Sequence, residues 1–186
     1  MKKLIIDLDD VICEGGFFTL INKFLNTEYT LSDVKGYYMQ SLIDDSKLDD
    51  FFEFLLDSNM YNYVEVIPNA IEVIEKLNDK YELYICSSFI IPNCEKDLGK
   101  LIKNKCEWIK ENMPFIKFSQ MIFTSEKHLI DADIRIDDGI NILSGKGDIK
   151  ILFTSYHNTH FKDAELVRKG ITRANNWIEI ERLLLG

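Results

Sequence analysis

The sequence has few basic residues, few prolines and no long apolar run. Its 186 residues include 22 Lys and Arg against 31 Asp and Glu, and the formal net charge is −9. This balance argues against a surface for a nucleic acid polymer, because such surfaces depend on clustered Lys and Arg. A small phosphorylated ligand needs only a local positive pocket, which an acidic protein can still provide.

The sequence has no paired cysteine motif, and its first residues predict no targeting segment. None of the cysteines at positions 13, 86, 94 and 106 forms a C-x-x-C pair. The first apolar run, Leu4–Ile6, is followed at once by acids and is too short for an export signal or a membrane span. These features predict unpaired thiols in a reducing cytoplasm, with no membrane partner.

Short apolar runs alternate with helical patterns along most of the chain. Residues 4–6, 83–86, 121–123, 134–136 and 149–153 each predict a strand buried on both faces. Helical periodicity covers 69–79, about Glu95 to Asn112, and 175–185. This alternation predicts an α/β fold, with a mostly parallel sheet and helices on both of its faces.

One segment interrupts the alternation. No strand is predicted from Gly15 to Val66, where Thr30-x-x-Asp33 and Ser46-x-x-Asp49 instead have the spacing of helix capping boxes. We therefore expect a small helical cap at residues 15–66, inserted after the first strand. Residues 1–14 and 67–186 would form the α/β core.

Polar side chains follow the predicted strands at their carboxyl ends, where open parallel sheets bind ligands. Asp7 and Asp9 stand two residues apart after the first strand, a spacing that places both carboxylates on one face. The whole set is Asp7, Asp9, Asp10, Ser87, Ser88, Lys127, Asp137 and Asp138. Several carboxylates suit Mg²⁺, and acids combined with a hydroxyl and a lysine suit phosphoryl transfer.

These same residues carry a family resemblance. The stretch LIIDLDDV at 4–11 resembles the first motif of the haloacid dehalogenase superfamily, and Ile85-Cys86-Ser87, Lys127 and Ile136-Asp137-Asp138 resemble the other three in order. Further stretches at 14–17, 36–38, 105–108, 127–138 and 151–158 are similar to the 5'(3')-deoxyribonucleotidases. The resemblance implies a haloacid-dehalogenase-like Rossmannoid sheet with a small helical cap. For the assembly it implies a homodimer.

The resemblance also implies a role for each site residue. Asp7 would attack phosphorus and form an aspartyl-phosphate, while Asp9 would act first as general acid and then as general base. Mg²⁺ would be held by the Asp7 carboxylate, the Asp9 backbone carbonyl and Asp138, with Asp137 orienting the site from behind. The phosphate oxygens would be bound by Ser87, Ser88, Lys105 and Lys127. The substrate would be a (deoxy)nucleoside monophosphate, with Phe17, Tyr37, Tyr38 and Tyr61 as candidate contacts.

Plainer interpretations exist for several of these residues. Ser87-Ser88 has the composition of a helix N-cap, and Lys105 that of an exposed helix residue. The aromatic side chains Tyr37, Tyr38 and Tyr61, together with Met60, suit the core of the cap as well as they suit base stacking. His157 and His160 lack a third metal ligand beside them, which favours hydrogen bonding within a loop.

The sequence departs from the family pattern at two places, and two alternative functions are compatible with it. Asp10 stands where the relatives have Gly, and Tyr37-Tyr38 stands where they have a Phe-Trp-like pair, so base preference is not fixed. One alternative is a phosphatase of the same type acting on another small metabolite. The other is a catalytically silent nucleotide-binding protein. The residues do not decide ribose against deoxyribose, 5' against 3' phosphate, or the oligomeric state.

Overall fold

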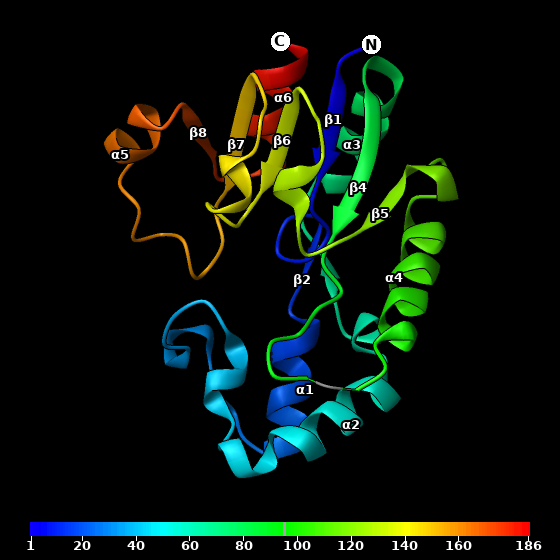
Figure 1. Ribbon diagram of the computed structural model, residues 1–186, viewed down its shortest axis with the longest axis vertical. Helices are drawn as coiled ribbons and strands as arrows, with labels where there is room; N and C mark the ends of the chain where they lie inside the picture. Colours follow the sequence, from blue (N-terminus) through cyan, green and yellow to red (C-terminus); the bar gives the residue numbers. More distant parts are fainter. Residues whose placement is uncertain (95) are drawn as a thin grey trace.

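Six parallel strands form the central sheet in the computed structural model, which describes residues 1–94 and 96–186 (Figure 1). The strands are β1 (Lys3–Ile6), β4 (Glu82–Ser87), β5 (Met121–Phe123), β6 (Ile134–Asp137), β7 (Ile149–Phe153) and β8 (Ile171–Ala174). Their order is β5-β4-β1-β6-β7-β8, and each neighbouring pair is parallel. The predicted parallel sheet is therefore confirmed, with β1 in its interior.

The sixth strand, β8, was not predicted. It pairs only with β7 at the edge of the sheet, and Thr172 and Arg173 leave it without an apolar run. An edge strand is covered incompletely, so it can keep polar residues that a strand buried on both faces excludes. The short helix before it, α5 (Asp163–Arg168), was also missed.

The longer predicted helices are present. Helix α3 (Ala70–Lys80) and helix α6 (Trp177–Leu185) pack against each other, and Lys76 pairs with Glu181 at 2.6 Å between them. Helix α4 spans Gly99–Asn112, while its predicted start, Glu95, lies outside the described residues. Among the helices of the described chain, none combines the length and apolar character needed to cross a membrane.

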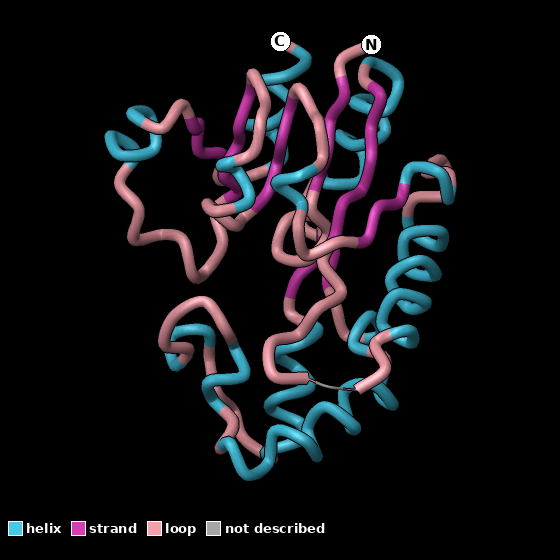
Figure 2. The backbone as a smooth tube through the Cα atoms, in the orientation of Figure 1, coloured by secondary structure: helices cyan, strands magenta, loops and turns pink. Residues whose placement is uncertain are grey.

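The segment after β1 forms a separate group of helices below the sheet (Figure 2). Helices α1 (Gly16–Leu25) and α2 (Leu48–Ser58) pack together, with the Phe17 and Phe51 rings edge to face at 5.5 Å between centroids. The Thr30–Asp33 capping box is formed. The Ser46–Asp49 box is not, because Asp44 accepts from the Ser46 backbone N–H and starts a short 3₁₀ turn there.

A two-stranded ribbon lies where the chain leaves the sheet and returns to it. Strand β2 (Cys13–Glu14) pairs antiparallel with β3 (Glu65–Val66), so the prediction of no strand up to Val66 is wrong at its end. Two residues are too few for an alternating pattern to show in a sequence. The ribbon gives the helical group two crossings to the sheet, directly below the end of β1 (Figure 1).

Candidate active site

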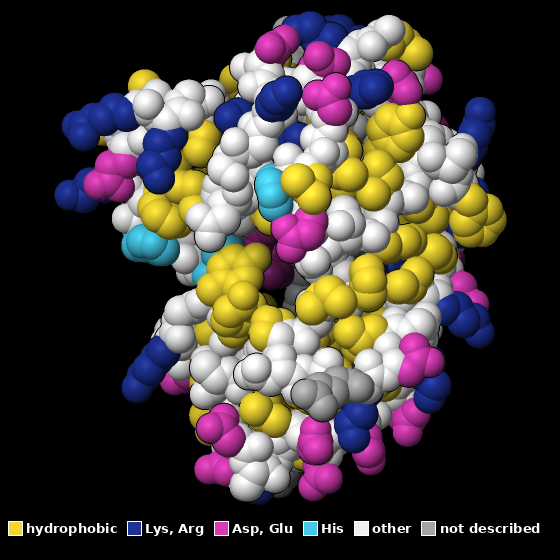
Figure 3. All heavy atoms as spheres, in the orientation of Figure 1, with side chains coloured by type: hydrophobic (Ala, Val, Ile, Leu, Met, Phe, Trp, Pro, Cys, Tyr) yellow, Lys and Arg dark blue, Asp and Glu magenta, His cyan; other side chains and the backbone are white. Residues whose placement is uncertain are grey.

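A cavity of about 390 Å³ opens where the carboxyl ends of β1, β4 and β6 face the helical group. From the sheet side it is lined by acids and lysines, including Asp7, Asp9, Asp138, Lys105 and Lys127. Apolar and aromatic side chains from the helical group and from the loop after β4 close the other side. In the space-filling view the surface is hollowed here, and apolar side chains border the hollow (Figure 3). The position agrees with the rule that parallel sheets bind ligands at this edge.

Asp7 is buried at the end of β1 and is held at both carboxylate oxygens. Oδ1 accepts from the Leu8 backbone N–H at 2.7 Å, and Oδ2 pairs with Lys127 Nζ at 2.6 Å. Burial raises the pKa of Asp7 from 3.8 to about 6, although Lys127 partly offsets the shift. The carboxylate is thus desolvated yet still charged near neutral pH, as a nucleophile requires.

Lys127 lies between two acids that come from different strands. Its Nζ is 2.6 Å from Asp7 and 2.8 Å from Asp137, and its side chain is buried. Burial alone would lower the pKa of Lys127, but Asp137 and Asp7 raise it above its usual range. The ammonium therefore stays protonated at every physiological pH.

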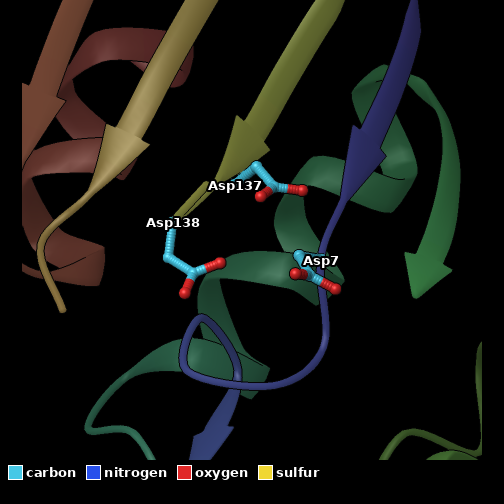
Figure 4. Close-up of side chains that lie close together, drawn as sticks. All are labelled: Asp7, Asp137 and Asp138. Atoms are coloured by element: carbon cyan, nitrogen blue, oxygen red, sulfur yellow. The ribbon is translucent and has the colours of Figure 1, made fainter. Parts of the chain in front are cut away.

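Three carboxylates, from Asp7, Asp137 and Asp138, lie close together at the ends of β1 and β6 (Figure 4). Asp7, Asp137 and Asp138 each offer an oxygen, and these oxygens lie within 4.8 Å of one another. Burial raises the pKa of both Asp137 and Asp138. Clustered carboxylate oxygens are the donors that a hard divalent cation prefers, so the residues present fit a metal site. The Asp137 carboxylate also accepts from Lys127 and from the Gly139 N–H.

The Asp9 carboxylate points away from that cluster. It accepts from Tyr61 Oη at 2.6 Å and from Lys105 Nζ at 2.5 Å, and Ser87 Oγ lies at 3.4 Å. Burial alone would raise the pKa of Asp9, but Lys105 and then Tyr61 hold it below its usual value. The structure therefore places one predicted acid at the carboxylate cluster and the other on a lysine.

The interpretations of Lys105 as an exposed helix residue and of Ser87 as a helix N-cap are wrong. Lys105 is buried and donates to Ser87 Oγ at 2.7 Å, so it is no exposed helix residue. Ser87 caps no helix, because the described chain continues as a loop until α4, and Ser87 is itself fully buried. Ser88 lines the cavity, where its Oγ accepts from the Ile90 backbone N–H.

Asp10 has a left-handed backbone, with φ of 57°. Glycine adopts this conformation without strain, and Asp is among the few other residues that tolerate it. The departure from the Gly of the relatives thus has a conformational explanation. Burial, together with Asp138, raises the pKa of Asp10 well above its usual value.

The candidate aromatic contacts separate into two groups. Phe17, Tyr37 and Tyr38 line the cavity, and both tyrosines are about half exposed there. Tyr61 is not a lining residue: it is buried, and its hydroxyl donates to Asp9. Tyr61 is therefore a packed residue that contacts Asp9 and not the cavity, whereas the rings of Tyr37 and Tyr38 are accessible to a ligand in the cavity.

The loop after β7 adds contacts that the sequence did not assign to the site. His157 Nε2 lies 2.6 Å from the Asp138 carboxylate, and Asn158 Nδ2 donates to the Asp138 carbonyl at 3.0 Å. Tyr156 Oη donates to the Tyr37 carbonyl at 2.6 Å. His157 therefore forms its hydrogen bond outside its own loop, with an acid of the carboxylate cluster, and the predicted bonding within a loop is wrong for it. Its acceptor could have been expected, since this loop follows a strand end at the same edge of the sheet.

Comparisons with known proteins found relatives along the whole chain. The relatives include the 5'(3')-deoxyribonucleotidase of Bacillus subtilis, 30% identical over the full length of both chains. That of Clostridium acetobutylicum is 28% identical over 96% of this chain and 92% of its own.

Solved structures show the same fold. A haloacid dehalogenase-like hydrolase from Streptococcus pneumoniae superposes with a TM-score of 0.63 at 15% identity, covering 98% of each chain. A hydrolase of this kind from Deinococcus radiodurans, solved with bound phosphate and sodium, gives 0.62 at 15% identity, covering 99% of this chain and 95% of its own. The family described as 5' nucleotidase, deoxy (pyrimidine), cytosolic type C protein matches residues 1–186. The chain therefore belongs to this nucleotidase family, and it is a hydrolase of phosphoric monoesters.

Proposed function

We propose that this enzyme is a Mg²⁺-dependent 5'(3')-deoxyribonucleotidase that removes phosphate from nucleoside monophosphates through an aspartyl-phosphate. The observation that supports it most is the position of Asp7. Its carboxylate is buried, stands against Lys127 and two further acids, and lines a cavity whose opposite wall is apolar and aromatic. One end of the cavity thus suits a phosphate and the other suits a base.

The proposed reaction takes the roles of the acids from the family resemblance, and the burial of Asp7 against Lys127 supports them. An Asp7 oxygen attacks phosphorus, and the bond from phosphorus to the nucleoside oxygen breaks as Asp9 donates a proton to that oxygen. Asp9 then takes a proton from the water that cleaves the aspartyl-phosphate. A divalent cation would be held by Asp7, the Asp9 backbone carbonyl and Asp138, and when bound it supplies charge neutralisation and orientation of the phosphate.

Lys105 connects phosphate binding to the proton on Asp9. In the structure its ammonium holds the Asp9 carboxylate at 2.5 Å, which favours the ionised form. A phosphate that draws Lys105 toward itself weakens this pair, and the pKa of Asp9 then rises toward the protonated acid that the first step needs. Lys127 and Ser88 would bind the remaining phosphate oxygens at the cavity wall.

The remaining expectations concern substrate, assembly and location. The names of the relatives and of the family support a pyrimidine deoxyribonucleoside monophosphate as substrate. A reducing cytoplasm remains a prediction from the unpaired cysteines of the sequence. A homodimer remains a prediction from the family resemblance.

The deciding experiment is phosphate release across a panel of nucleoside monophosphates, sugar phosphates and one aryl phosphate. We expect turnover in the presence of Mg²⁺, its loss with EDTA, and a preference for dUMP or dTMP. Turnover of sugar phosphates alone would favour the alternative phosphatase and contradict the nucleotide assignment. No turnover of any phosphomonoester would leave the silent nucleotide-binding protein as the explanation.

Tyr38 should matter for nucleotides and little for small aryl phosphates. Stacking of a base on an aromatic ring contributes about 1–3 kcal/mol. Because the Tyr38 ring is half exposed at the cavity, Tyr38→Ala should raise KM for dUMP roughly tenfold while the aryl phosphate KM stays near its original value. Tyr29→Ala, at an exposed residue of the same helical group that does not line the cavity, is the matched control. Equal KM changes for both substrates would refute a base contact.

A further inference from the structure

Arg135 lies in the middle of β6, and its side chain is fully buried. Its guanidinium donates to three backbone carbonyls: Nε to Lys146 at 2.6 Å, Nη1 to Lys127 at 3.1 Å, and Nη2 to Ile130. Within the described part of the chain, the buried ion pairs join Lys105 to Asp9, Lys127 to Asp7 and Asp137, and His157 to Asp138, so Arg135 has no carboxylate partner. A buried cation without a counter-ion is costly, and the three carbonyl contacts offset part of this cost.

The surroundings of the guanidinium are shaped for it. Gly145 lies against the head group, and a Cβ atom there would stand only 2.9 Å from Arg135 Cζ and 2.9 Å from the His128 carbonyl oxygen. Real Cβ atoms do not approach so closely, so any larger residue would displace the arginine or the loop. Arg135 therefore fills a space that the turn at 145–147 leaves open for it.

What the arginine holds is the loop that carries Lys127. The Lys127 carbonyl accepts from the Ile130 backbone N–H at 3.1 Å, which closes a 3₁₀ turn, and the same oxygen accepts from Arg135. Ile130, at the end of the turn, is bound through its own carbonyl. The guanidinium therefore fixes both ends of this turn to β6.

The side chain of Lys127 is attached to the same strand. Residues i and i+2 of a strand share a face, so Arg135 and Asp137 point to the same side of β6. Asp137 accepts from Lys127 Nζ at 2.8 Å, while Arg135 donates to the Lys127 carbonyl. One face of one strand thus holds this lysine at its backbone and at its ammonium.

We propose that Arg135 is a positioning residue for Lys127. By fixing the backbone of the turn, it keeps the ammonium between Asp7 and Asp137, where it can meet a phosphate oxygen. This inference rests on the proposed phosphatase function, because that function gives Lys127 its task. A merely structural arginine would stabilise the fold without acting through Lys127.

The test uses two variants. Arg135→Met keeps much of the length of the side chain but removes its donors. Arg135→Lys keeps the positive charge but replaces three donor nitrogens with one. Misplacement of a binding group by about 1 Å can lower a rate about 100-fold. We therefore expect kcat for an aryl phosphate to fall about 10- to 100-fold in Arg135→Met and less in Arg135→Lys. In the background of Lys127→Met, Arg135→Met should cause little additional loss, because the residue on which it acts is gone.

A second readout does not depend on turnover. Hydrogen–deuterium exchange at the amides of Leu129 and Ile130 should accelerate in Arg135→Met, with α6 unchanged as the internal control. Unchanged kcat, or the same loss of kcat with and without Lys127, would overturn the proposal. If Arg135→Met does not fold, Arg135→Lys is compared in both backgrounds instead. If the wild-type chain hydrolyses no phosphomonoester, the proposed function fails. If exchange in the turn is the same in Arg135→Met, Arg135 does not fix the backbone of the Lys127 turn, and this inference fails by itself.

Discussion

Asp7→Asn should abolish phosphate release, lowering kcat for an aryl phosphate by about 10⁴-fold or more. The amide is nearly the same size as the carboxylate but has no nucleophilic anion, and loss of a nucleophile removes most of the catalytic advantage. Phosphate release in the presence of Mg²⁺ measures the effect. Asp79→Asn, at an exposed acid of α3 that does not line the cavity, is the matched control and should retain full activity.

The same variant should remain folded, and its stability gives an independent check. The pKa of Asp7 is raised from 3.8 to about 6, so the folded state binds a proton more tightly than the unfolded state. The wild type therefore loses stability as the pH rises through this window, and Asp7→Asn should lack that part of the loss. Urea unfolding at pH 4 and pH 7 would show it. An active Asp7→Asn enzyme would contradict the assignment of Asp7 as nucleophile, whereas an unfolded one would contradict the expected stability.

Of the proposed substitutions, Lys127→Met should lower the free energy of unfolding the most, and mainly at neutral and alkaline pH. Removing one partner of a buried ion pair costs about 3–5 kcal/mol, because the other charge is left without compensation. Lys127 is one of the groups that lower the pKa of Asp7 and Asp137, so in its absence both values should rise further above the usual range. The loss of stability should be large at pH 8 and smaller near pH 5, where these carboxyls take up protons.

An exposed lysine pair provides the contrast for this prediction. Lys100 pairs with Asp57 at 2.7 Å, but both side chains are mostly exposed. Such surface pairs contribute about 0–1 kcal/mol, so Lys100→Met should change the urea midpoint little at either pH. A loss in Lys127→Met that is equal at pH 5 and pH 8 would show that the lysine does not compensate the buried acids.

Sequence patterns were most informative where burial is complete. The predicted strands inside the sheet and the three predicted helices recur because a strand covered on both faces needs a continuous apolar run, and a packed helix needs one apolar side. The edge strand β8 and the ribbon of β2 and β3 escaped prediction, since short or half-covered strands need no such run. Strand β5 was predicted as buried on both faces because its residues are apolar, but it lies at the other edge of the sheet and is only half-buried.

The site residues show where such patterns stop being informative. Chain order and strand ends were enough to bring Asp7, Asp138 and Lys127 together, because every parallel strand delivers its next residue to the same edge. The direction in which a side chain points cannot be predicted in this way. Asp9 turns to Lys105 and Tyr61, contacts that join residues far apart in the sequence and that no local spacing encodes.

The sequence by itself thus determined the sheet and the carboxylates at its edge, because these depend on local periodicity and on residue type, while the class of chemistry came from the resemblance of its motifs to a known family. Only the tertiary structure decided that Lys105 is buried, that His157 faces Asp138, and that Arg135 holds the Lys127 turn. Each of these depends on a contact between segments that are brought together only when the core packs, and the energy of a buried charge is set by those distant neighbours.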